Sequence, residues 1–143
     1  MTVTRAGLMG LGAYLAVWAS AASAADWPGW RGPNRDAVSQ EQGLLQEWPA
    51  QGPPLLWKFA GVGAGLASVS VSGDRVFTLG DKDGAQQVFA LQRETGRLRW
   101  SAKVGAPWND EYGGGRGTPT IDGDLLYAIG TEGDLVCLET ATG

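Results

Sequence analysis

The sequence contains no histidine and a single cysteine, Cys137. Without histidine, the protein has no serine–histidine or cysteine–histidine nucleophile pair and lacks the commonest metal ligand. One cysteine allows neither an internal disulfide nor a thiolate zinc cluster. Basic residues are also sparse and unclustered, because 11 lysines and arginines stand against 15 acidic residues, a net charge of −4. We therefore expect no nucleic-acid partner, since phosphate neutralisation needs a basic stripe.

Turn-forming residues are abundant instead. The 143 residues include 23 glycines and 7 prolines, well above the average share of these two residue types. This composition predicts one modest domain with many turns and many short strands.

Residues 1–24 have the pattern of a secretory signal peptide. Arg5 supplies a positive start, residues 6–18 are apolar and nearly uncharged, and Ala22-Ser23-Ala24 offers small residues for cleavage. The apolar run is shorter than the about 20 residues of a membrane span. We expect cleavage after Ala24 and a periplasmic or secreted protein with no stable membrane span; an uncleaved N-terminal anchor is the alternative. No cysteine lies near the cut for lipid attachment.

The remaining sequence contains an internal repeat, in which residues 118–143 follow the pattern of residues 68–96. Six residues of the first unit have counterparts 50 positions further on: Val71, Gly73, Asp74, Val76, Phe77 and Gly80 match Ile121, Gly123, Asp124, Leu126, Tyr127 and Gly130. Three more have counterparts 47 positions on: Leu91, Thr95 and Gly96 match Leu138, Thr142 and Gly143. The shorter spacing falls in a turn, where length changes are tolerated.

Each unit has the pattern of short strands separated by tight turns. Residues 75–79 and 88–91 are apolar and β-prone, as are 125–129 and 135–138, and Asp83-Gly84 between the first two suits a hairpin turn. Residues 97–104 alternate apolar and polar positions and supply a fourth strand. Four-stranded antiparallel units of about this length predict an all-β fold, the β-propeller, in which each sheet is one blade.

The expected organisation follows from these units. Residues 25–54 form an N-terminal extension or clamp, and residues 55–61 an outer strand that closes the propeller by pairing beyond Gly143. The first full blade covers about 67–104 and an incomplete second blade 118–143. We expect the sequence to be the N-terminal part of a longer protein, with one to two blades.

Several segments carry a family resemblance. Residues 88–100, "VFALQRETGRLRW", resemble the tryptophan-docking repeat of β-propellers related to pyrroloquinoline quinone (PQQ) enzymes. These include quinoprotein alcohol dehydrogenases and outer-membrane assembly lipoproteins of the BamB type. Three further segments, "DWPGWRGPNRDAVS", "LLWKFAGVGAG" and residues 113–143, are similar to exported PQQ-binding-like β-propeller repeat proteins. The likeness covers the whole expected mature protein; it implies the fold more strongly than a function.

The resemblance implies a structural role for two tryptophans. Trp100, and with less sequence support Trp57, correspond to the residue that packs between neighbouring blades in this family. Ala37 departs from the subgroup pattern, which has glycine after Asp36, and alanine resists a positive φ.

Residues 26–41 hold two of the seven tryptophans without helical or strand periodicity. We interpret this stretch as a clamp across the seam or rim of the blades, with Trp27 and Trp30 covering apolar surface and its charged side chains facing outward or pairing. Ligand binding is the alternative, because exposed arginines and aromatic side chains are frequent in binding hot spots.

Three short motifs favour structural interpretations. Cys137 aligns with Ala90, which predicts a small buried position. "GDKDG" at 80–84 begins like a calcium loop but lacks the later acidic ligand, so a hairpin turn is favoured. "GVGAG" at 61–65 aligns with 111–115 and predicts a tight connection between blades rather than a nucleotide loop.

The long connection after the first blade is the best functional candidate. It gathers polar and aromatic side chains on one loop: Trp108, Asn109, Asp110, Glu111, Tyr112 and Arg116. Loops on rigid scaffolds carry function disproportionately, although most long loops are only solvated connections.

Two functions remain open from the sequence. The first is a non-catalytic exported scaffold that binds an envelope protein, a peptide or a glycan. The second is a PQQ-dependent oxidoreductase of alcohols or sugars, with PQQ and calcium over the propeller axis; only this alternative implies a cofactor. The residues contain no catalytic set, and one cysteine cannot form the vicinal pair of many such dehydrogenases.

Overall fold

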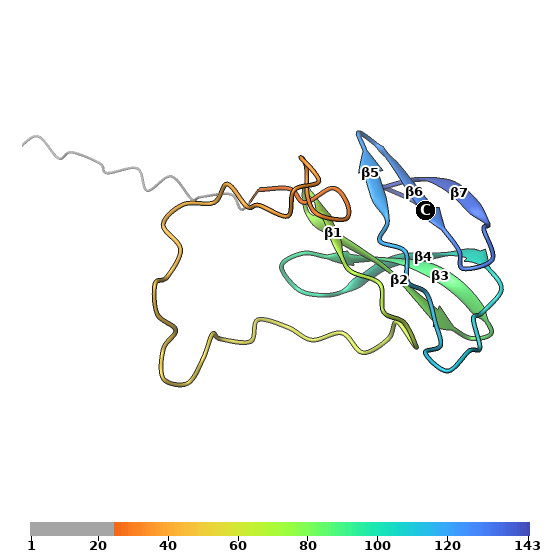
Figure 1. The fold of residues 1–143 in the computed structure, drawn as a ribbon, viewed down its shortest axis with the longest axis horizontal. Helices are drawn as coiled ribbons and strands as arrows, with labels where there is room; N and C mark the ends of the chain where they lie inside the picture. Colours follow the sequence, from red (N-terminus) through yellow and green to blue (C-terminus); the bar gives the residue numbers. More distant parts are fainter. Residues whose placement is uncertain (1–24) are drawn as a thin grey trace, which may run out of the picture.

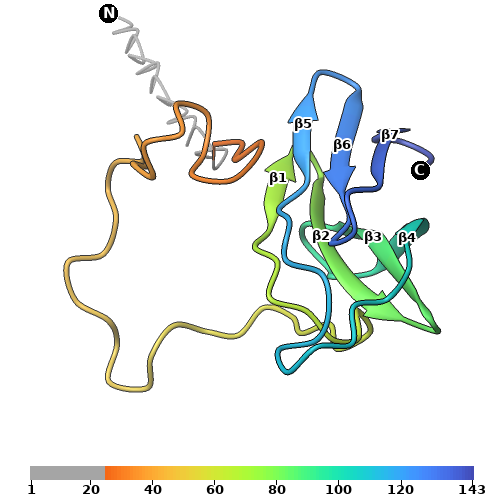
Figure 2. The ribbon, with the colours of Figure 1, turned by 45° about the vertical axis from the view of Figure 1, so that its right-hand side comes forward.

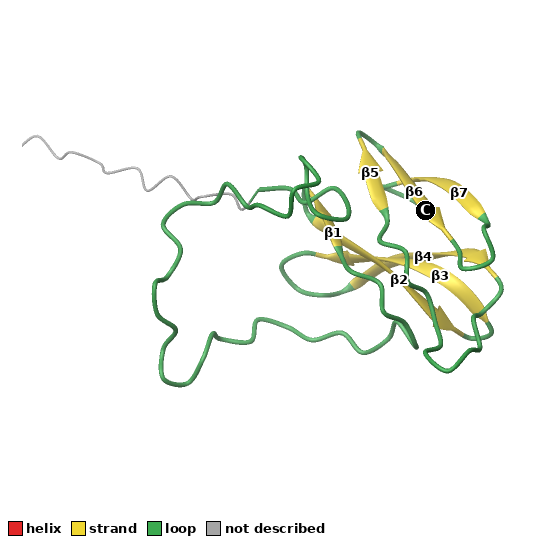
Figure 3. Ribbon diagram, viewed as in Figure 1, coloured by secondary structure: helices red, strands yellow, loops and turns green. Residues whose placement is uncertain are grey.

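The computed structural model describes residues 25–143, which form strands and loops without a helix (Figure 3). The predicted signal peptide, residues 1–24, lies outside the described residues. The strands are β1 (Ser70–Ser72), β2 (Arg75–Lys82), β3 (Ala85–Gln92), β4 (Leu98–Gly105), β5 (Thr120–Asp122), β6 (Leu125–Ile129) and β7 (Leu135–Glu139).

These strands form two antiparallel sheets that follow the order of the sequence. The first is β1-β2-β3-β4 and the second is β5-β6-β7. The prediction of an all-β fold with four-stranded antiparallel blades is confirmed, with a full first blade and three strands of a second. Figures 1 and 2 show the second sheet lying against the first, as adjacent blades of a propeller do.

The repeat seen in the sequence is present in the pairing register. Val76 pairs with Leu91 in the first blade, and their counterparts Leu126 and Leu138 pair in the second. The strands are therefore equivalent residue by residue. The three-residue deletion lies beyond the pair Ile129 and Leu135, so the second hairpin is shorter and the pairs before it keep their register.

Tight turns join the strands where the sequence predicts them. Asp83 and Gly84 have φ of 52° and 75° between the paired residues Lys82 and Ala85. Positive φ at both central positions is the geometry of a type I′ hairpin turn, which matches the twist of the strands. "GDKDG" is thus part of a hairpin.

The core lies between the two blades. Phe77 and Leu79 of β2 and Val88 of β3 pack with Leu126 and Ala128 of β6. Fully burying each large side chain contributes about 1.5–3 kcal/mol. Neither sheet buries this face alone, so the blades depend on each other for stability.

Cys137 corrects one prediction, because it is exposed rather than buried. Its counterpart Ala90 is fully buried, since that face of the first blade packs on the second. The same face of the second blade is open among the described residues, and Tyr127, Ile129 and Leu135 are exposed there too. The repeat identified the equivalent position correctly but not what covers it.

Residues 38–56 form a long exposed connection that loops away from the sheets (Figure 1). Residues 55–60 form no strand with the described residues. The polypeptide returns to the first blade at Trp57, whose indole N–H donates to the Arg93 carbonyl at 2.7 Å.

Candidate functional site

The connection between β4 and β5, residues 106–119, lies at the end of the blades opposite the β5–β6 turn (Figures 1 and 2). It contains all six residues predicted as a contact loop. A neighbouring connection runs beside it, because Gly65 and Gly115 form a parallel bridge and Leu66 N–H donates to the Gly115 carbonyl at 2.8 Å. These two glycines are repeat counterparts, so the "GVGAG" segment is the same connection one blade earlier.

Asp81 at the end of β2 fixes the start of this loop. The Trp108 backbone N–H donates to Asp81 Oδ2 at 2.5 Å, and the Gly114 N–H donates to the Trp108 carbonyl at 2.9 Å. Hydrogen bonds to a carboxylate are stronger than neutral ones. The loop is therefore held to the blade at its base.

A second carboxylate organises the tip. Asp110 Oδ2 accepts from Arg116 Nη2 at 2.7 Å, and Asp110 Oδ1 accepts from the Tyr112 N–H at 3.0 Å. The ion pair is solvated, so its main effect is on the shape of the loop.

These contacts lower the pKa of Asp110 from its usual 3.8. The adjacent Trp108 side chain is the main cause; Arg116 and the Tyr112 N–H also lower this pKa, while desolvation opposes them. The Trp108 indole N–H is buried without a partner of full hydrogen-bond geometry among the described residues. The indole dipole of Trp108 therefore acts on Asp110 as a polar neighbour and not through a formed hydrogen bond. Asp110 is ionised at neutral pH.

The surface of the loop is mixed in character. Tyr112 is 65% exposed, Asn109 and Glu111 are exposed, and Trp108 is half-buried. Trp108 and Asp110 line a cavity of about 470 Å³ that reaches the β2–β3 turn at Asp83. A smaller one of about 330 Å³ extends from the same two side chains to Glu132. The arrangement can bind a partner through an aromatic side chain beside shallow polar hollows.

A buried polar network beneath the loop was not anticipated from the sequence. Gln86 on β3 is fully buried and its Nε2 donates to Asp81 Oδ1 at 3.0 Å and to Thr131 Oγ1 at 3.2 Å. Its Oε1 accepts from the Thr131 N–H at 2.9 Å. The network links both blades to the carboxylate that anchors the loop.

Trp57 and Trp100 make equivalent contacts. The Trp100 indole N–H donates to the Thr140 carbonyl at 3.1 Å, and the ring lies over Gly143. Trp57 donates to the Arg93 carbonyl and lies over Gly96, the repeat counterpart of Gly143. A Cβ on either glycine would stand 2.7 Å or less from the indole. Trp100 thus joins the first blade to the second.

The N-terminal stretch contacts the first strand of each blade. Trp27 exchanges two backbone hydrogen bonds with Val71 of β1, both 2.8 Å, and the Ile121 N–H of β5 donates to the Pro28 carbonyl at 2.7 Å. Asp26 Oδ1 accepts from the Gly73 N–H at 2.9 Å. One segment therefore connects β1 and β5.

The expectation for Trp30 is wrong. The residue is 65% exposed rather than buried on the blades, and the Arg31 guanidinium lies 4.9 Å from its ring centroid. The Trp27 ring instead lies over Gly32, within the same turn. Ala37 has φ of 62°, the conformation for which glycine is better suited.

Among residues 25–143, no three acidic or cysteine side chains gather where they could hold a metal ion. Over the same range there is no helix of the length and apolarity needed to cross a membrane.

Comparison with known proteins gave one family. A family model described as outer membrane protein assembly factor BamB (PQQ_2) matches residues 17–143. A search among curated proteins found no match. The family match covers both blades and the N-terminal segment that connects them. The protein therefore belongs to this PQQ-like repeat family and is a propeller-type module.

Proposed function

We propose that this protein is a non-catalytic binding module of the bacterial cell envelope, and that the 106–119 connection contacts its partner. The observation that carries the proposal is that Asp81 anchors Trp108 to the blade and Asp110 pairs with Arg116 within the loop, while Tyr112 remains exposed. A loop already ordered before binding loses less conformational freedom on association.

The composition of the loop suits a protein or peptide partner, with a glycan as the other class. Tyrosine, tryptophan and arginine are the residues that most often dominate binding energy. Tyr112 and Trp108 offer large contact area with few rotatable bonds. Asn109 and Glu111 are exposed beside them and supply polar contacts at the rim.

The proposed location is the periplasm or the cell surface. The signal-peptide pattern of residues 1–24 supports export. The description of the matching family, an outer membrane protein assembly factor, supports an envelope role. Mass spectrometry of envelope-fraction protein should find the N-terminus at Ala25 or Asp26; a protein that keeps Met1 contradicts the export proposal.

The test uses site-specific crosslinking in cells. A photoreactive amino acid at Tyr112 should crosslink a defined envelope component, whereas the same probe at Thr95, exposed on the β3–β4 turn, should not. With that component purified, Trp108→Ala together with Arg116→Ala should weaken binding at least about 30-fold, which corresponds to about 2 kcal/mol.

The controls separate binding from folding and from catalysis. Trp48→Ala with Arg97→Ala removes one exposed tryptophan and one exposed arginine elsewhere and should leave affinity unchanged. Because Trp108 is half-buried, Tyr112→Ala serves as a second loop variant that spares the interior. Unchanged partner binding by both loop variants refutes the proposal. So does PQQ- and calcium-dependent reduction of an artificial electron acceptor with alcohols or sugars by the purified protein.

A further inference from the structure

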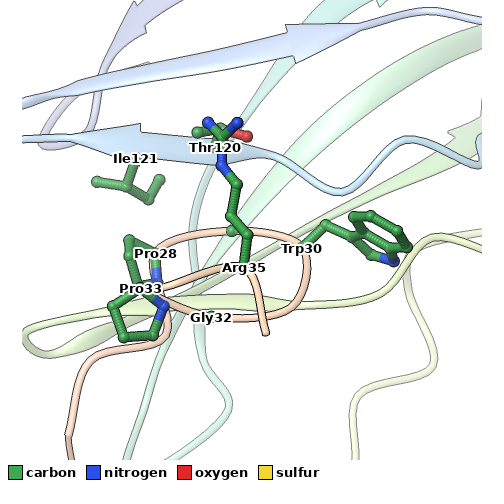
Figure 4. Close-up of a pocket in the computed structure, with 8 residues that line it drawn as sticks. Pro28, Trp30, Gly32, Pro33, Arg35, Thr120 and Ile121 are labelled. Carbon is green, nitrogen blue, oxygen red and sulfur yellow. The ribbon is translucent and has the colours of Figure 1, made fainter. Parts of the chain in front are cut away.

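A third cavity, away from the 106–119 connection, lies between the N-terminal turn and β5 (Figure 4). It has a volume of about 410 Å³, within the range of small-ligand pockets. Pro28, Pro33 and Ile121 supply apolar walls, and Arg35 and Thr120 supply polar groups. In Figure 4 the Arg35 side chain extends from the turn toward β5, while the Trp30 ring points away from the other side chains.

The Arg35 guanidinium has no acidic partner among residues 25–143. Arg75, Arg99 and Arg116 form ion pairs elsewhere in the described residues, and Arg31 lies over the Trp30 ring. Asp36 forms no ion pair with Arg35 among the described residues, and its Oδ1 accepts from the Val38 N–H at 2.9 Å. The planar guanidinium of Arg35 therefore lies at the wall of an apolar cavity with its N–H donors available to a ligand. Such a group matches a carboxylate, which it can bind through two parallel hydrogen bonds.

The backbone around the cavity is held in place. Ile121 N–H donates to the Pro28 carbonyl at 2.7 Å, and Gly32 N–H donates to the Gly29 carbonyl at 3.0 Å. Arg31 and Arg35 have φ of 66° and 58°, in the left-handed region that non-glycine residues rarely adopt. Strained residues of this kind concentrate at ligand-binding segments. A fixed turn presents Arg35 without the cost of ordering a mobile loop.

Gly29 keeps the cavity open toward β5. A Cβ at this position would stand 3.3 Å from Thr120 Oγ1, closer than most such contacts. The absence of a side chain lets the turn lie directly on the strand and leaves the hydroxyl at the cavity wall. Thr120 Oγ1 can then donate a hydrogen bond to the same anion as Arg35.

We propose that this cavity binds a peptide carboxylate next to an apolar group, with Arg35 and Thr120 holding the carboxylate and Pro28, Pro33 and Ile121 contacting the apolar group. The carboxylate comes either from the carboxyl terminus of a polypeptide or from an acidic residue within it. This site is separate from the 106–119 connection and does not depend on the function proposed for it.

The test compares matched peptides with the unmodified full-length protein. Acetyl-Ala-Leu with a free carboxyl terminus is compared with its amidated form, and acetyl-Leu-Glu-amide with acetyl-Leu-Gln-amide. Binding is followed by titration calorimetry and by the NMR shift of the Thr120 amide. One carboxylate peptide should bind at least about tenfold more tightly than its neutral match, because a charge-assisted bidentate contact is lost in the latter. The pair that shows this difference identifies the source of the carboxylate.

Variants assign the effect to the cavity. Arg35→Gln should abolish the preference for the carboxylate peptide, and Thr120→Val should reduce it about threefold or more. Arg97→Gln is the matched control, because it removes the same charge from an exposed arginine on the β3–β4 turn. Arg35→Lys keeps the positive charge but cannot form two parallel hydrogen bonds, so its affinity for the carboxylate peptide should lie between those of the unmodified protein and Arg35→Gln. This variant replaces Arg35→Gln in the test if the glutamine variant folds poorly.

Three results would overturn the proposal. They are equal binding of both peptides of each pair, an equal loss of the preference in Arg97→Gln and Arg35→Gln, and shifts confined to the 106–119 connection. Equal binding within each pair would mean that the protein does not recognise a carboxylate. An equal loss in both variants would mean that only the net charge of the protein matters. Shifts confined to residues 106–119 would mean that the peptide binds at the other site.

Discussion

Replacement of Gln86 by leucine should expose how much the buried network contributes to the blade interface. The substitution keeps similar volume but removes three hydrogen bonds, to Asp81 Oδ1, Thr131 Oγ1 and the Thr131 N–H. Each of the two neutral bonds contributes about 1 kcal/mol and the bond to the carboxylate about 1.5–3 kcal/mol. Burial of the leucine methyls returns about 1 kcal/mol. We expect a net destabilisation of about 3 kcal/mol.

The assay combines urea unfolding with amide hydrogen exchange. The unfolding midpoint should fall, and the Thr131 amide should lose protection because its acceptor Gln86 Oε1 is gone. Gln87→Leu is the control: Gln87 Nε2 donates to the Lys82 carbonyl at 2.9 Å within the same hairpin, so its loss should cost no more than about 1 kcal/mol. A loss below about 1 kcal/mol in Gln86→Leu, or unchanged Thr131 exchange, refutes the argument that this network joins the blades.

Three further predictions follow from local geometry. Ala37→Gly should stabilise the protein by about 0.5–1 kcal/mol in thermal or urea unfolding, because φ is 62° there; Ala106→Gly, at a position without positive φ, should not. Trp100→Phe should destabilise by about 1–2 kcal/mol in the same measurement, because the indole hydrogen bond to the Thr140 carbonyl is lost and the ring contact with Phe77 is weakened; no change contradicts a blade-joining role. The pKa of Asp110 is lowered in the fold, so the contribution of its carboxylate to loop order is present above pH 3.8 and is lost as the pH falls through the lowered pKa. An NMR titration of the Tyr112 amide should show this loss. Arg116→Gln should move the midpoint of that titration to higher pH.

The strand framework could be predicted because the same strand pattern occurs twice in the sequence, once in each unit of the internal repeat. Val76 with Leu91 and Leu126 with Leu138 are apolar pairs at equivalent positions, and the structure pairs both. The hairpin at Asp83-Gly84 was predictable for a separate reason, since few residues other than these tolerate positive φ at two successive positions. Periodicity and turn chemistry are local properties, and the sequence displays them directly.

The Gln86 network could not be predicted by the same means. Gln86 and Gln87 are adjacent and chemically identical, yet one is fully buried and the other is not. The regular alternation of β3 places Gln86 on the same face as Val88 and Ala90, toward the second blade, but it does not show that a glutamine on this face is fully hydrogen-bonded. The partner Thr131 lies in a turn of the other blade, with no sequence feature that marks it. A polar contact between distant segments leaves no periodic signal.

The open face of the second blade shows how the repeat both predicts and misleads. Tyr127, Ile129 and Leu135 are exposed, whereas their counterparts Phe77, Leu79 and Val88 are 0–2% exposed. The equivalent side chains are apolar in both blades, so the face has the composition of an interior although the described residues leave it uncovered. Equivalence along the sequence fixes which way a side chain points from its sheet; burial depends on a neighbouring sheet. Sequence similarity between blades therefore predicts orientation, and only the spatial arrangement determines whether the surface is core or interface.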